Sequence, residues 1–286
     1  MSLHQLKKVA NFRQLHSNEG PVKIYRSAFP GDATEEDVQY LRDVLGIQMI
    51  ISLCFPAEEG SPTEKKPLDV AYKRVLVTEE EIEDMKSKGT TGEMLSKDMP
   101  YVHCNMRLPS TKYFAQLQGT LKKAQIDGLS QFEQLAYLME NVGYPRGMVQ
   151  MYIDLCETSQ IQFFTASKLL SEPKNVPALI HCVGGKDRTG IISAFIQTCV
   201  GLPREKVLID YETFKPSMGM SQIYQNYVMP EEFLSSSKET METLLEYMDK
   251  KYGSVQEYLT YIGFGPEDQE KMKKNILINT TQQESI

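Results

Sequence analysis

The stretch His181-Cys-Val-Gly-Gly-Lys-Asp-Arg-Thr-Gly190 decides the fold of this chain. It directly follows the apolar run 176–180, which predicts a short buried strand. Residues 191–200 are mostly apolar and predict a buried helix that ends at Gly201-Leu-Pro203. A strand, a short loop and a helix in this order put the loop at the carboxyl end of a strand, where open α/β sheets bind their ligands.

The loop between this strand and this helix has the composition of an anion-binding cradle. Gly184 and Gly185 let the backbone curl, so that successive N–H groups can turn inward. The helix that begins near Thr189 adds its positive N-terminal end, and Arg188 offers a planar fork for two phosphate oxygens. We therefore expect a bound phosphate to contact Val183, Gly184, Gly185, Lys186, Asp187 and Arg188.

Cys182 lies at the centre of this expected cradle and is the candidate nucleophile. The inward N–H groups, the helix N-terminus and Arg188 favour its thiolate at neutral pH, and a thiolate can attack phosphorus in line. We expect the Thr189 hydroxyl to donate a hydrogen bond to this sulfur, and His181 to orient the loop without acting as a base. A core thiol at a sheet edge is the alternative. The glycine patterns of dinucleotide and Walker-type loops are absent.

This loop resembles the signature His-Cys-x-x-Gly-x-x-Arg-Ser/Thr of the cysteine-dependent protein tyrosine phosphatase superfamily. Its Gly-Lys-Asp-Arg-Thr-Gly version is similar to the LipA-like atypical phosphatases, which include tyrosine-specific, dual-specificity and phosphoinositide-hydrolysing members. Two further stretches carry the same resemblance: Asn11-Phe-Arg-Gln-Leu15 with Tyr25-Arg-Ser27, and Tyr252-Gly-Ser-Val-Gln-Glu-Tyr-Leu259. The resemblance implies hydrolysis of phosphomonoesters through a phospho-cysteine intermediate, with no metal and no other cofactor.

Three positions depart from the family pattern. Gln14 stands where the family usually has Asp, and Ser52 and Cys54 stand where it usually has Asp-Leu-Arg. An ion-pair network near the site is therefore missing or replaced. These departures leave open a catalytically weak phosphopeptide-binding module, and a rhodanese-type sulfurtransferase is a third possibility. Within the phosphatases, a phosphoinositide phosphatase is the alternative to a protein tyrosine or dual-specificity phosphatase.

The resemblance points to Asp187 as the general acid that protonates the leaving group. The chain has no tryptophan, so the mobile Trp-Pro-Asp loop of many relatives is absent. Lys186 and Arg188 oppose protonation of Asp187, and a purely structural role for it stays open. Lys186 either contacts a second phosphate, as in phosphoinositide-hydrolysing relatives, or is a surface lysine. Rival proton donors are Asp98, Asp127 and Asp154.

Strands that alternate with helices, followed by a run of helices, predict an α/β fold. We expect a short, mostly parallel central sheet flanked by helices, with a helical insertion. The expected strands are 23–27, 47–55, 70–77 and 176–180; the expected helices begin near 34, 111, 145, 191, 204, 230 and 254. We expect residues 1–279 to form a single phosphatase domain, with 57–141 an insertion or lid over the site and 280–286 a polar tail.

The composition limits the classes of partner that the protein can bind. The chain has 286 residues and a net charge of −7, the opposite of what a general nucleic-acid or anionic-membrane binder carries. The five cysteines include no Cys-x-x-Cys pair, which excludes a zinc ribbon or a thioredoxin motif. With no apolar signal region or membrane-spanning run in the sequence, we expect a cytoplasmic protein. The family resemblance implies that it acts on phosphorylated protein or phosphoinositide. The sequence does not predict the oligomeric state.

Overall fold

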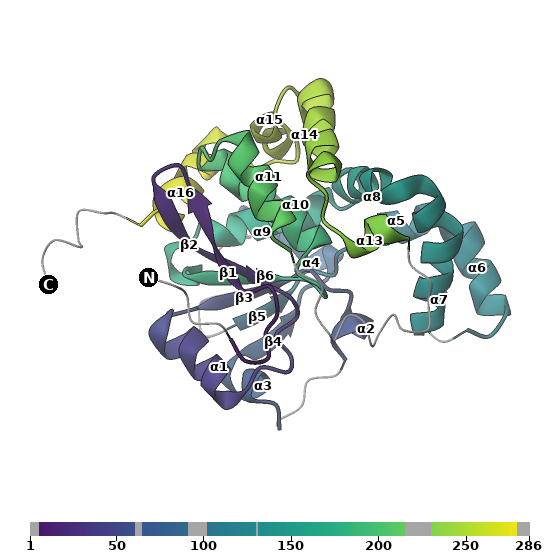
Figure 1. Cartoon of the computed structure of the whole chain (residues 1–286), viewed down its shortest axis with the longest axis horizontal. Coiled ribbons are helices and arrows are strands. Elements are labelled where there is room, and N and C mark those ends of the chain that lie inside the picture. Colours follow the sequence, from purple (N-terminus) through teal and green to yellow (C-terminus); the bar gives the residue numbers. More distant parts are fainter. Residues whose placement is uncertain (1–5, 61–64, 91–101, 130, 215–229, 279–286) are drawn as a thin grey trace, which may run out of the picture.

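A six-stranded sheet forms the centre of the described part of the chain, with strand order β1-β2-β6-β3-β5-β4 (Figure 1). The computed structural model describes residues 6–60, 65–90, 102–129, 131–214 and 230–278. Neighbouring strands are parallel, except that β1 and β2 form an antiparallel hairpin. The strands are β1 Arg13–Ser17, β2 Gly20–Ser27, β3 Met49–Ser52, β4 Lys73–Leu76, β5 Val102–Asn105 and β6 Ala178–His181.

The carboxyl ends of four strands meet at one edge of the sheet. His181 of β6 pairs with Ser27 of β2 on one side and with Ser52 of β3 on the other, and Ser52 pairs with Asn105 of β5. All four residues are buried. The polar loop that follows β6 therefore starts at the middle of this edge, as expected for a ligand site in an open α/β sheet.

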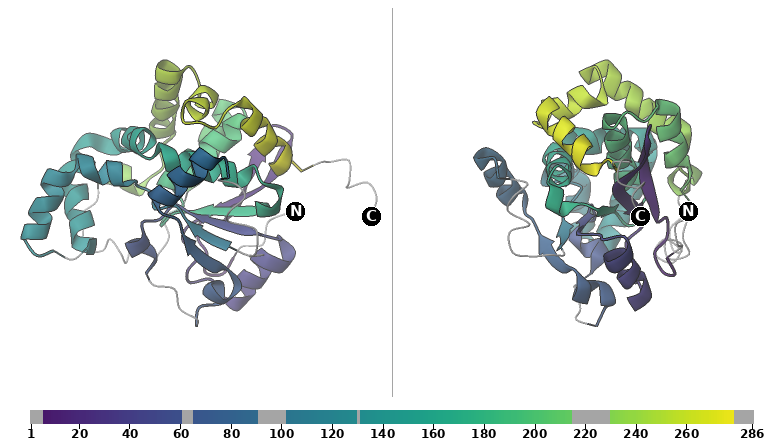
Figure 2. Two further views of the ribbon diagram at one scale, coloured as in Figure 1. Left: turned by 180° about the vertical axis from the view of Figure 1, so that it is seen from behind. Right: turned by 90° about the vertical axis from the view of Figure 1, so that its left-hand side faces the viewer.

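Helices cover both faces of the sheet, as Figures 1 and 2 show. Side chains of a strand alternate between its two faces, so Ile50 and Leu179 join one core while Met49, Ile51 and Ile180 join the other. The first core packs under α1 Glu35–Gln39 and α3 Pro67–Ala71, and the second is covered by the helices that follow β5. The mostly parallel α/β architecture predicted from the sequence is confirmed.

The remaining helices fall into two groups, before and after β6. Those before β6 are the π-helix η1 Tyr40–Val44, α2 Pro56–Glu59, α4 Glu79–Lys88, α5 Thr111–Gln116, α6 Gln118–Ile126, α7 Gln131–Leu138, the π-helix η2 Met139–Gly143, α8 Tyr144–Thr158, α9 Gln160–Leu170 and the 3-10 helix η3 Pro173–Asn175. Those after β6 are α10 Asp187–Cys199, α11 Arg204–Glu212, α13 Glu231–Leu234, α14 Lys238–Tyr252, α15 Val255–Tyr261 and α16 Pro266–Ile276.

Several of the predicted boundaries are wrong: the expected strand 47–55 is only Met49–Ser52, the expected strand 23–27 already starts at Gly20, and two further differences have a local cause. The predicted strand 70–77 starts only at Lys73, because Pro67 opens α3 and the chain leaves this helix at the buried Tyr72. The helix expected to begin near 230 is broken after Leu234, and α14 starts at Lys238 after its N-cap Ser237, whose side chain accepts a hydrogen bond from Thr240 N. By contrast, the helices expected to begin near 34 and 254 do so, with Thr34 and Ser254 as their N-caps.

The stretch 57–141 is only partly separate from the sheet. Its strands β4 and β5 form one side of the sheet, whereas α6 and α7 lie at the right-hand edge of the molecule in Figure 1. That this stretch is an insertion or lid stays a prediction, and the tail 280–286 lies outside the described residues.

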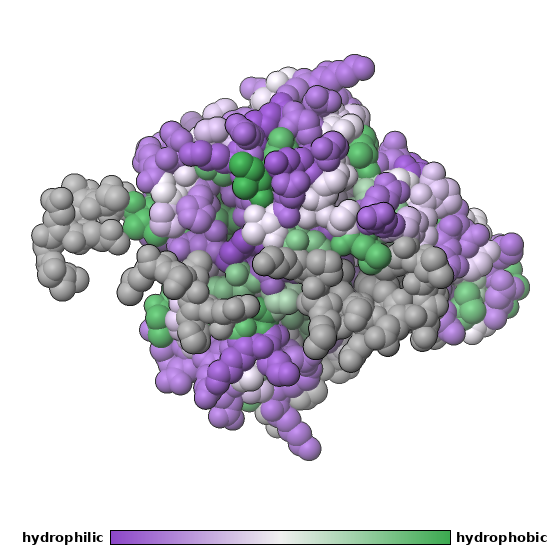
Figure 3. Space-filling model, in the orientation of Figure 1, coloured by the Kyte–Doolittle hydropathy of each residue, from purple (hydrophilic) through white to green (hydrophobic). Residues whose placement is uncertain are grey.

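The outer surface and the helix lengths complete the description. On the face shown in Figure 3 the described surface is mainly hydrophilic, with apolar side chains in small separate groups. No helix in the described ranges is long and apolar enough to cross a lipid bilayer.

Candidate active site

The loop after β6 begins with Cys182, which is almost fully buried at 1% exposure. Four consecutive carbonyl groups of this loop accept hydrogen bonds from outside it. His181 Nδ1 lies 3.2 Å from the Cys182 oxygen, and Phe29 N donates to the Val183 oxygen at 2.9 Å. Asn11 Nδ2 donates to the Gly184 oxygen at 3.0 Å, and Arg26 Nη2 donates to the Gly185 oxygen at 2.9 Å.

These contacts set the direction of the N–H groups. The peptide bonds of the loop are trans, so each N–H points away from the carbonyl of the same peptide unit. Holding the carbonyls of residues 182–185 on the outside therefore turns the N–H groups of residues 183–186 to the inside. Within the described residues none of these four N–H groups donates to a protein acceptor, so they are available to an anion. The anion cradle expected from the glycines would use these four N–H groups.

Gly185 is needed where the loop passes the end of β2. Its φ is +70°, in the left-handed region that favours glycine. A Cβ atom there would lie 2.4 Å from the Ser27 oxygen, closer than any ordinary contact. The hydrogen bond from Arg26 to the Gly185 oxygen depends on this close approach.

Arg188 is held by Glu58, a residue that the sequence analysis did not single out. Glu58 Oε2 accepts from Nη1 at 2.6 Å and Glu58 Oε1 accepts from Nη2 at 2.9 Å. Nη1 also donates to the carbonyl oxygens of Leu53 and Leu108 at 3.0 and 3.1 Å. These contacts use the end of the guanidinium, and the side formed by Nε and the second Nη2 hydrogen makes no hydrogen bond within the described residues. That side is the fork that can hold two phosphate oxygens.

Arg188 keeps its positive charge although its side chain is mostly buried. Burial works against this charge, but the Glu58 carboxylate and the neighbouring Cys182 raise the pKa of Arg188 above its ordinary value. The guanidinium therefore stays positive beside Cys182, as the predicted role in phosphate binding requires.

Arg26 is a buried residue and not the surface ion-pair partner that a lone arginine suggests. It is 1% exposed and donates from Nη1 to Asp210 Oδ2 at 2.6 Å. Asp210 Oδ1 accepts from Arg13 Nε at 2.9 Å. Burial raises the pKa of Asp210, but the two arginines outweigh it and hold that pKa below its usual value. Arg26, which belongs to the N-terminal part of the family resemblance, thus holds the loop through its hydrogen bond to the Gly185 oxygen.

Lys186 and Asp187 are both engaged by neighbouring side chains or carbonyls. Lys186 is 1% exposed, and its Nζ donates to the carbonyl oxygens of Phe233 and Ser235 at 2.6 and 3.0 Å. Asp187 Oδ1 lies 3.3 Å from Lys186 Nζ and accepts from the Tyr152 hydroxyl at 2.6 Å. The Asp187 side chain is one-third exposed, and its Oδ2 makes no hydrogen bond within the described ranges.

The other predicted residues make no hydrogen bond to Cys182 in the described part of the chain. The hydrogen bond expected from Thr189 to Cys182 is not formed, although the buried Thr189 hydroxyl has no other partner in the described part of the chain. Asp154 pairs with Arg146 and accepts from Gln150 on its own helix α8. Asp127 ends α6 as an exposed C-cap, and Asp98 lies outside the described residues.

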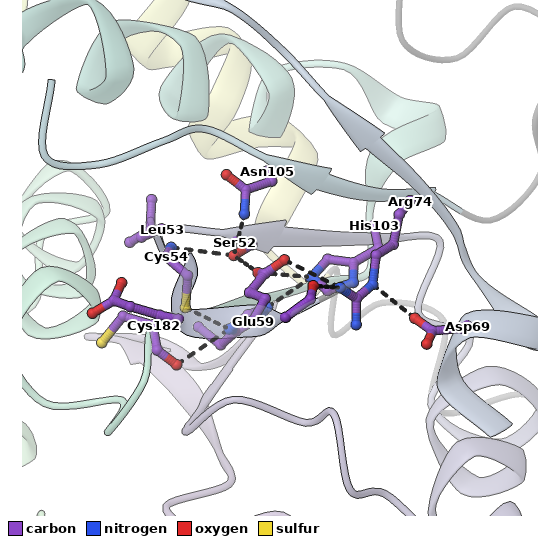
Figure 4. Close-up of polar contacts among 12 residues, drawn as sticks. Ser52, Leu53, Cys54, Glu59, Asp69, Arg74, His103, Asn105 and Cys182 are labelled. Atoms are coloured by element: carbon purple, nitrogen blue, oxygen red, sulfur yellow. Dashed lines mark hydrogen bonds and ion pairs between the residues drawn. The ribbon is translucent and has the colours of Figure 1, made fainter. Parts of the chain in front are cut away.

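A buried polar network replaces the ion pairs that Ser52 and Cys54 put in doubt (Figure 4). Ser52 Oγ donates to Glu59 Oε1 and accepts from Cys54 N at 3.2 Å. Arg74 Nη1 lies 3.6 Å from Glu59 Oε2, so a glutamate from α2 serves as the acidic partner at this end of the sheet. His103 Nε2 lies 3.6 Å from Glu59 Oε1. At the third departure, Gln14 Nε2 donates to the Val22 oxygen at 2.9 Å.

Cys54, Glu59 and His181 place one possible metal-binding atom each within 4.8 Å of one another. These groups are already engaged, because Glu59 accepts from Ser52 and His181 Nδ1 faces the Cys182 oxygen. Burial also raises the pKa of the Cys54 thiol well above its ordinary value, so this sulfur keeps its proton. A metal here would have to break the contact between His181 and the loop.

Comparison with known protein families gives a match that extends over nearly the whole chain. The family described as "Tyrosine phosphatase family" matches residues 4–278. A tyrosine-protein phosphatase of Nostoc commune is 29% identical over 68 residues, which are 24% of this chain and 23% of that protein. The match thus spans less than a quarter of the length of this curated relative.

Two solved structures are also similar. One is the core catalytic domain of the PP-IP phosphatase SIW14 from S. cerevisiae in complex with citrate, with 16% identity and a TM-score of 0.35, covering 79% of this chain and 91% of that one. The other is the Siw14 catalytic core, with 15% identity and a TM-score of 0.36, covering 80% and 91%. Because the family match extends over nearly the whole chain and includes Cys182 and Arg188, the chain belongs to the tyrosine phosphatase family of cysteine-dependent phosphatases.

Proposed function

We propose that this protein hydrolyses phosphomonoesters through a phospho-cysteine intermediate on Cys182. One observation carries the proposal: the carbonyls of residues 182–185 are held by groups outside the loop, which turns the N–H groups of residues 183–186 to the opposite side of the loop that begins at Cys182. Such preorganised donors stabilise the charge on a transferring phosphoryl group. The free side of the Arg188 guanidinium supplies two further donors to the same oxygens.

The proposed reaction has two steps. The Cys182 thiolate forms an S–P bond while the P–O bond to the leaving group breaks, and the leaving oxygen takes a proton from Asp187. Water then attacks phosphorus, Asp187 accepts its proton, and the S–P bond breaks to release inorganic phosphate and the thiolate. Asp187 Oδ1 is anchored by Tyr152 and Lys186, which leaves Oδ2 to carry the proton.

A phosphorylated protein is the substrate that we favour over a phosphoinositide. A phosphoinositide phosphatase would use Lys186 for a second phosphate, but its ammonium group already donates to Phe233 and Ser235 and lies 3.3 Å from Asp187. Protein tyrosine or dual-specificity activity requires only the cradle, Arg188 and a proton donor. The match to the tyrosine phosphatase family supports an enzyme over the alternative of a phosphopeptide-binding module.

We also propose that the stretch 57–141 shapes the mouth of the site. Glu58 and the carbonyl of Leu108 both contact Arg188, so two separate parts of this stretch reach the loop.

A cytoplasmic location is consistent with the five cysteines, all of which are free thiols in the structure.

Release of phosphate from an aryl phosphate tests the proposal directly. Cys182→Ser should abolish turnover and keep phosphate binding, because the N–H groups of the cradle remain. Cys199→Ser is the matched control, since Cys199 lies at the far end of α10 and should leave turnover unchanged. A Cys182→Ser protein that retains more than a few per cent of wild-type turnover would rule out Cys182 as the nucleophile.

The choice of substrate is tested with a panel. Phosphotyrosine and phosphothreonine peptides and soluble phosphoinositides are compared by phosphate release under the same conditions. We expect the highest kcat/KM with a phosphopeptide. A higher value with a phosphoinositide would favour the alternative and would require Lys186 to leave its carbonyl partners.

A further inference from the structure

Two buried histidines, His103 and His181, face each other next to the Cys182 loop. The proposed chemistry does not use His103. His103 of β5 and His181 of β6 are separated by β3, yet their Nε2 atoms are 2.9 Å apart. The ring centroids lie 5.1 Å apart, and neither side chain is more than 1% exposed. A contact this short requires a hydrogen between the two nitrogens.

Neither ring carries a charge at neutral pH. Burial lowers the pKa of His181 to about 3, with Arg188 and Arg74 contributing in the same direction. Burial also holds the pKa of His103 well below its ordinary value, with His181 and Arg74 contributing. Each ring therefore has one N–H group and one lone pair.

The partner of His181 Nδ1 decides which nitrogen carries the hydrogen. Nδ1 faces the Cys182 oxygen at 3.2 Å, and because a carbonyl only accepts, Nδ1 must be the N–H. The Nε2 atom of His181 then carries a lone pair and no hydrogen. It can accept a hydrogen bond only from His103, which must therefore be protonated at Nε2. Glu59 Oε1 lies 3.6 Å from this nitrogen, and its negative charge favours an N–H there.

The opposite arrangement leaves two buried groups unsatisfied. If His181 carried its hydrogen on Nε2, its Nδ1 lone pair would face the Cys182 oxygen, and only the Cys54 thiol, 3.9 Å away, could donate to it. His103 would then carry its hydrogen on Nδ1. That atom is buried and has no partner in the described part of the chain, and an unpaired buried N–H is rarer than an unpaired acceptor.

We propose that His103 is a positioning residue for the Cys182 loop. It donates from Nε2 to His181 and so fixes His181 in the tautomer whose Nδ1–H holds the Cys182 carbonyl. Because that carbonyl and the Val183 N–H belong to one trans peptide, the position of His103 sets the direction of the first N–H group of the cradle. The kinetic part of this inference rests on the proposed phosphatase function.

Nitrogen-15 NMR of the imidazole rings tests the tautomers without a variant and without activity. The chain has four histidines, and the spectrum of His103→Gln identifies the His103 signals. We expect His181 protonated at Nδ1 and His103 protonated at Nε2 in the wild-type protein. A His181 ring protonated at Nε2 would overturn the proposal even if the enzyme proved inactive on every substrate.

Two variants test the consequence for catalysis. In His103→Gln the amide nitrogen can still donate near the original Nε2 position, so kcat/KM should stay within about threefold of wild type. His103→Leu removes the donor and should lower kcat/KM at least about tenfold, since losing a whole cradle donor costs roughly 10²–10³-fold. Thermal unfolding of both variants identifies any that fail to fold.

The pattern of results separates positioning from mere packing. Equal losses in His103→Gln and His103→Leu, with both proteins folded, would mean that the ring shape matters and the donated hydrogen does not, and would overturn the proposal. Wild-type protein that releases no phosphate from any substrate would refute the phosphatase function, and the NMR tautomers would still decide the role of His103.

Discussion

Replacing Gly185 with alanine would test how the loop is anchored to the sheet. The backbone cost comes from φ = +70°, where an L residue with a side chain loses about 1–2 kcal/mol. The steric cost is larger, because the new Cβ would lie 2.4 Å from the Ser27 oxygen, where an ordinary contact is 3.4–4 Å. The loop must therefore shift by about 1 Å, and a misplacement of that size can cost roughly 10²-fold in rate.

Gly201→Ala is the matched control for this experiment. Gly201 has φ = +79°, but nothing lies within 4 Å of an added Cβ. This variant should show only the backbone cost, a fall in Tm of about 2–8 °C for a protein of this size, with unchanged kcat/KM. Gly185→Ala should lose roughly 10²-fold in kcat/KM for an aryl phosphate and bind inorganic phosphate more weakly. If Gly185→Ala matches Gly201→Ala in both Tm and activity, the loop is not held by its close approach to Ser27.

Three further predictions concern charged groups around the loop. Glu58→Gln weakens the support of Arg188 and should raise KM and the inhibition constant of phosphate several-fold, with a smaller change in kcat; an unchanged phosphate affinity would count against it. Asp187→Asn should slow phenyl phosphate more than nitrophenyl phosphate, whose leaving group needs little protonation, and equal losses would place the donor elsewhere. The pKa of Asp210 is lower in the folded protein, so its ion pairs stabilise the fold above the unfolded pKa of about 3.9, and this stabilisation is lost as the pH falls through the folded pKa. Asp210→Asn should therefore lower the free energy of unfolding at pH 7 and change it little near pH 2, as measured by urea unfolding.

The parts of the site that lie close together in the sequence could be predicted from it. The apolar run before His181, the two glycines and the position of Arg188 at a helix start each carry a local signal, and the structure places them as expected. Local patterns of this kind depend only on strand periodicity, backbone freedom and helix ends. They were therefore enough to predict the strand, the loop and the helix on which the proposed cradle depends.

The supporting residues could not be predicted in this way because their partners are distant. Glu58 stands in a charged stretch that resembles a solvated loop, and only the fold shows that α2 turns this carboxylate toward Arg188. His103 lies in the short strand Val102–Asn105, where polar side chains hide the apolar pattern of a buried strand. Lys186 looked like a substrate contact, because nothing in its neighbourhood indicates that the Phe233 carbonyl would reach it.

The way in which the cradle is anchored also has a consequence for synthesis of the chain. Asn11 and Gly184, which form one of its hydrogen bonds, are 173 positions apart, and Arg26 and Gly185 are 159 apart. At ribosomal rates of about 5–20 residues per second, roughly 8–35 s pass between the synthesis of the two partners of each bond. During that interval the N-terminal hairpin has no β6 to pair with. A nascent chain without β6 therefore lacks these anchors, and the proposed activity requires a complete sheet.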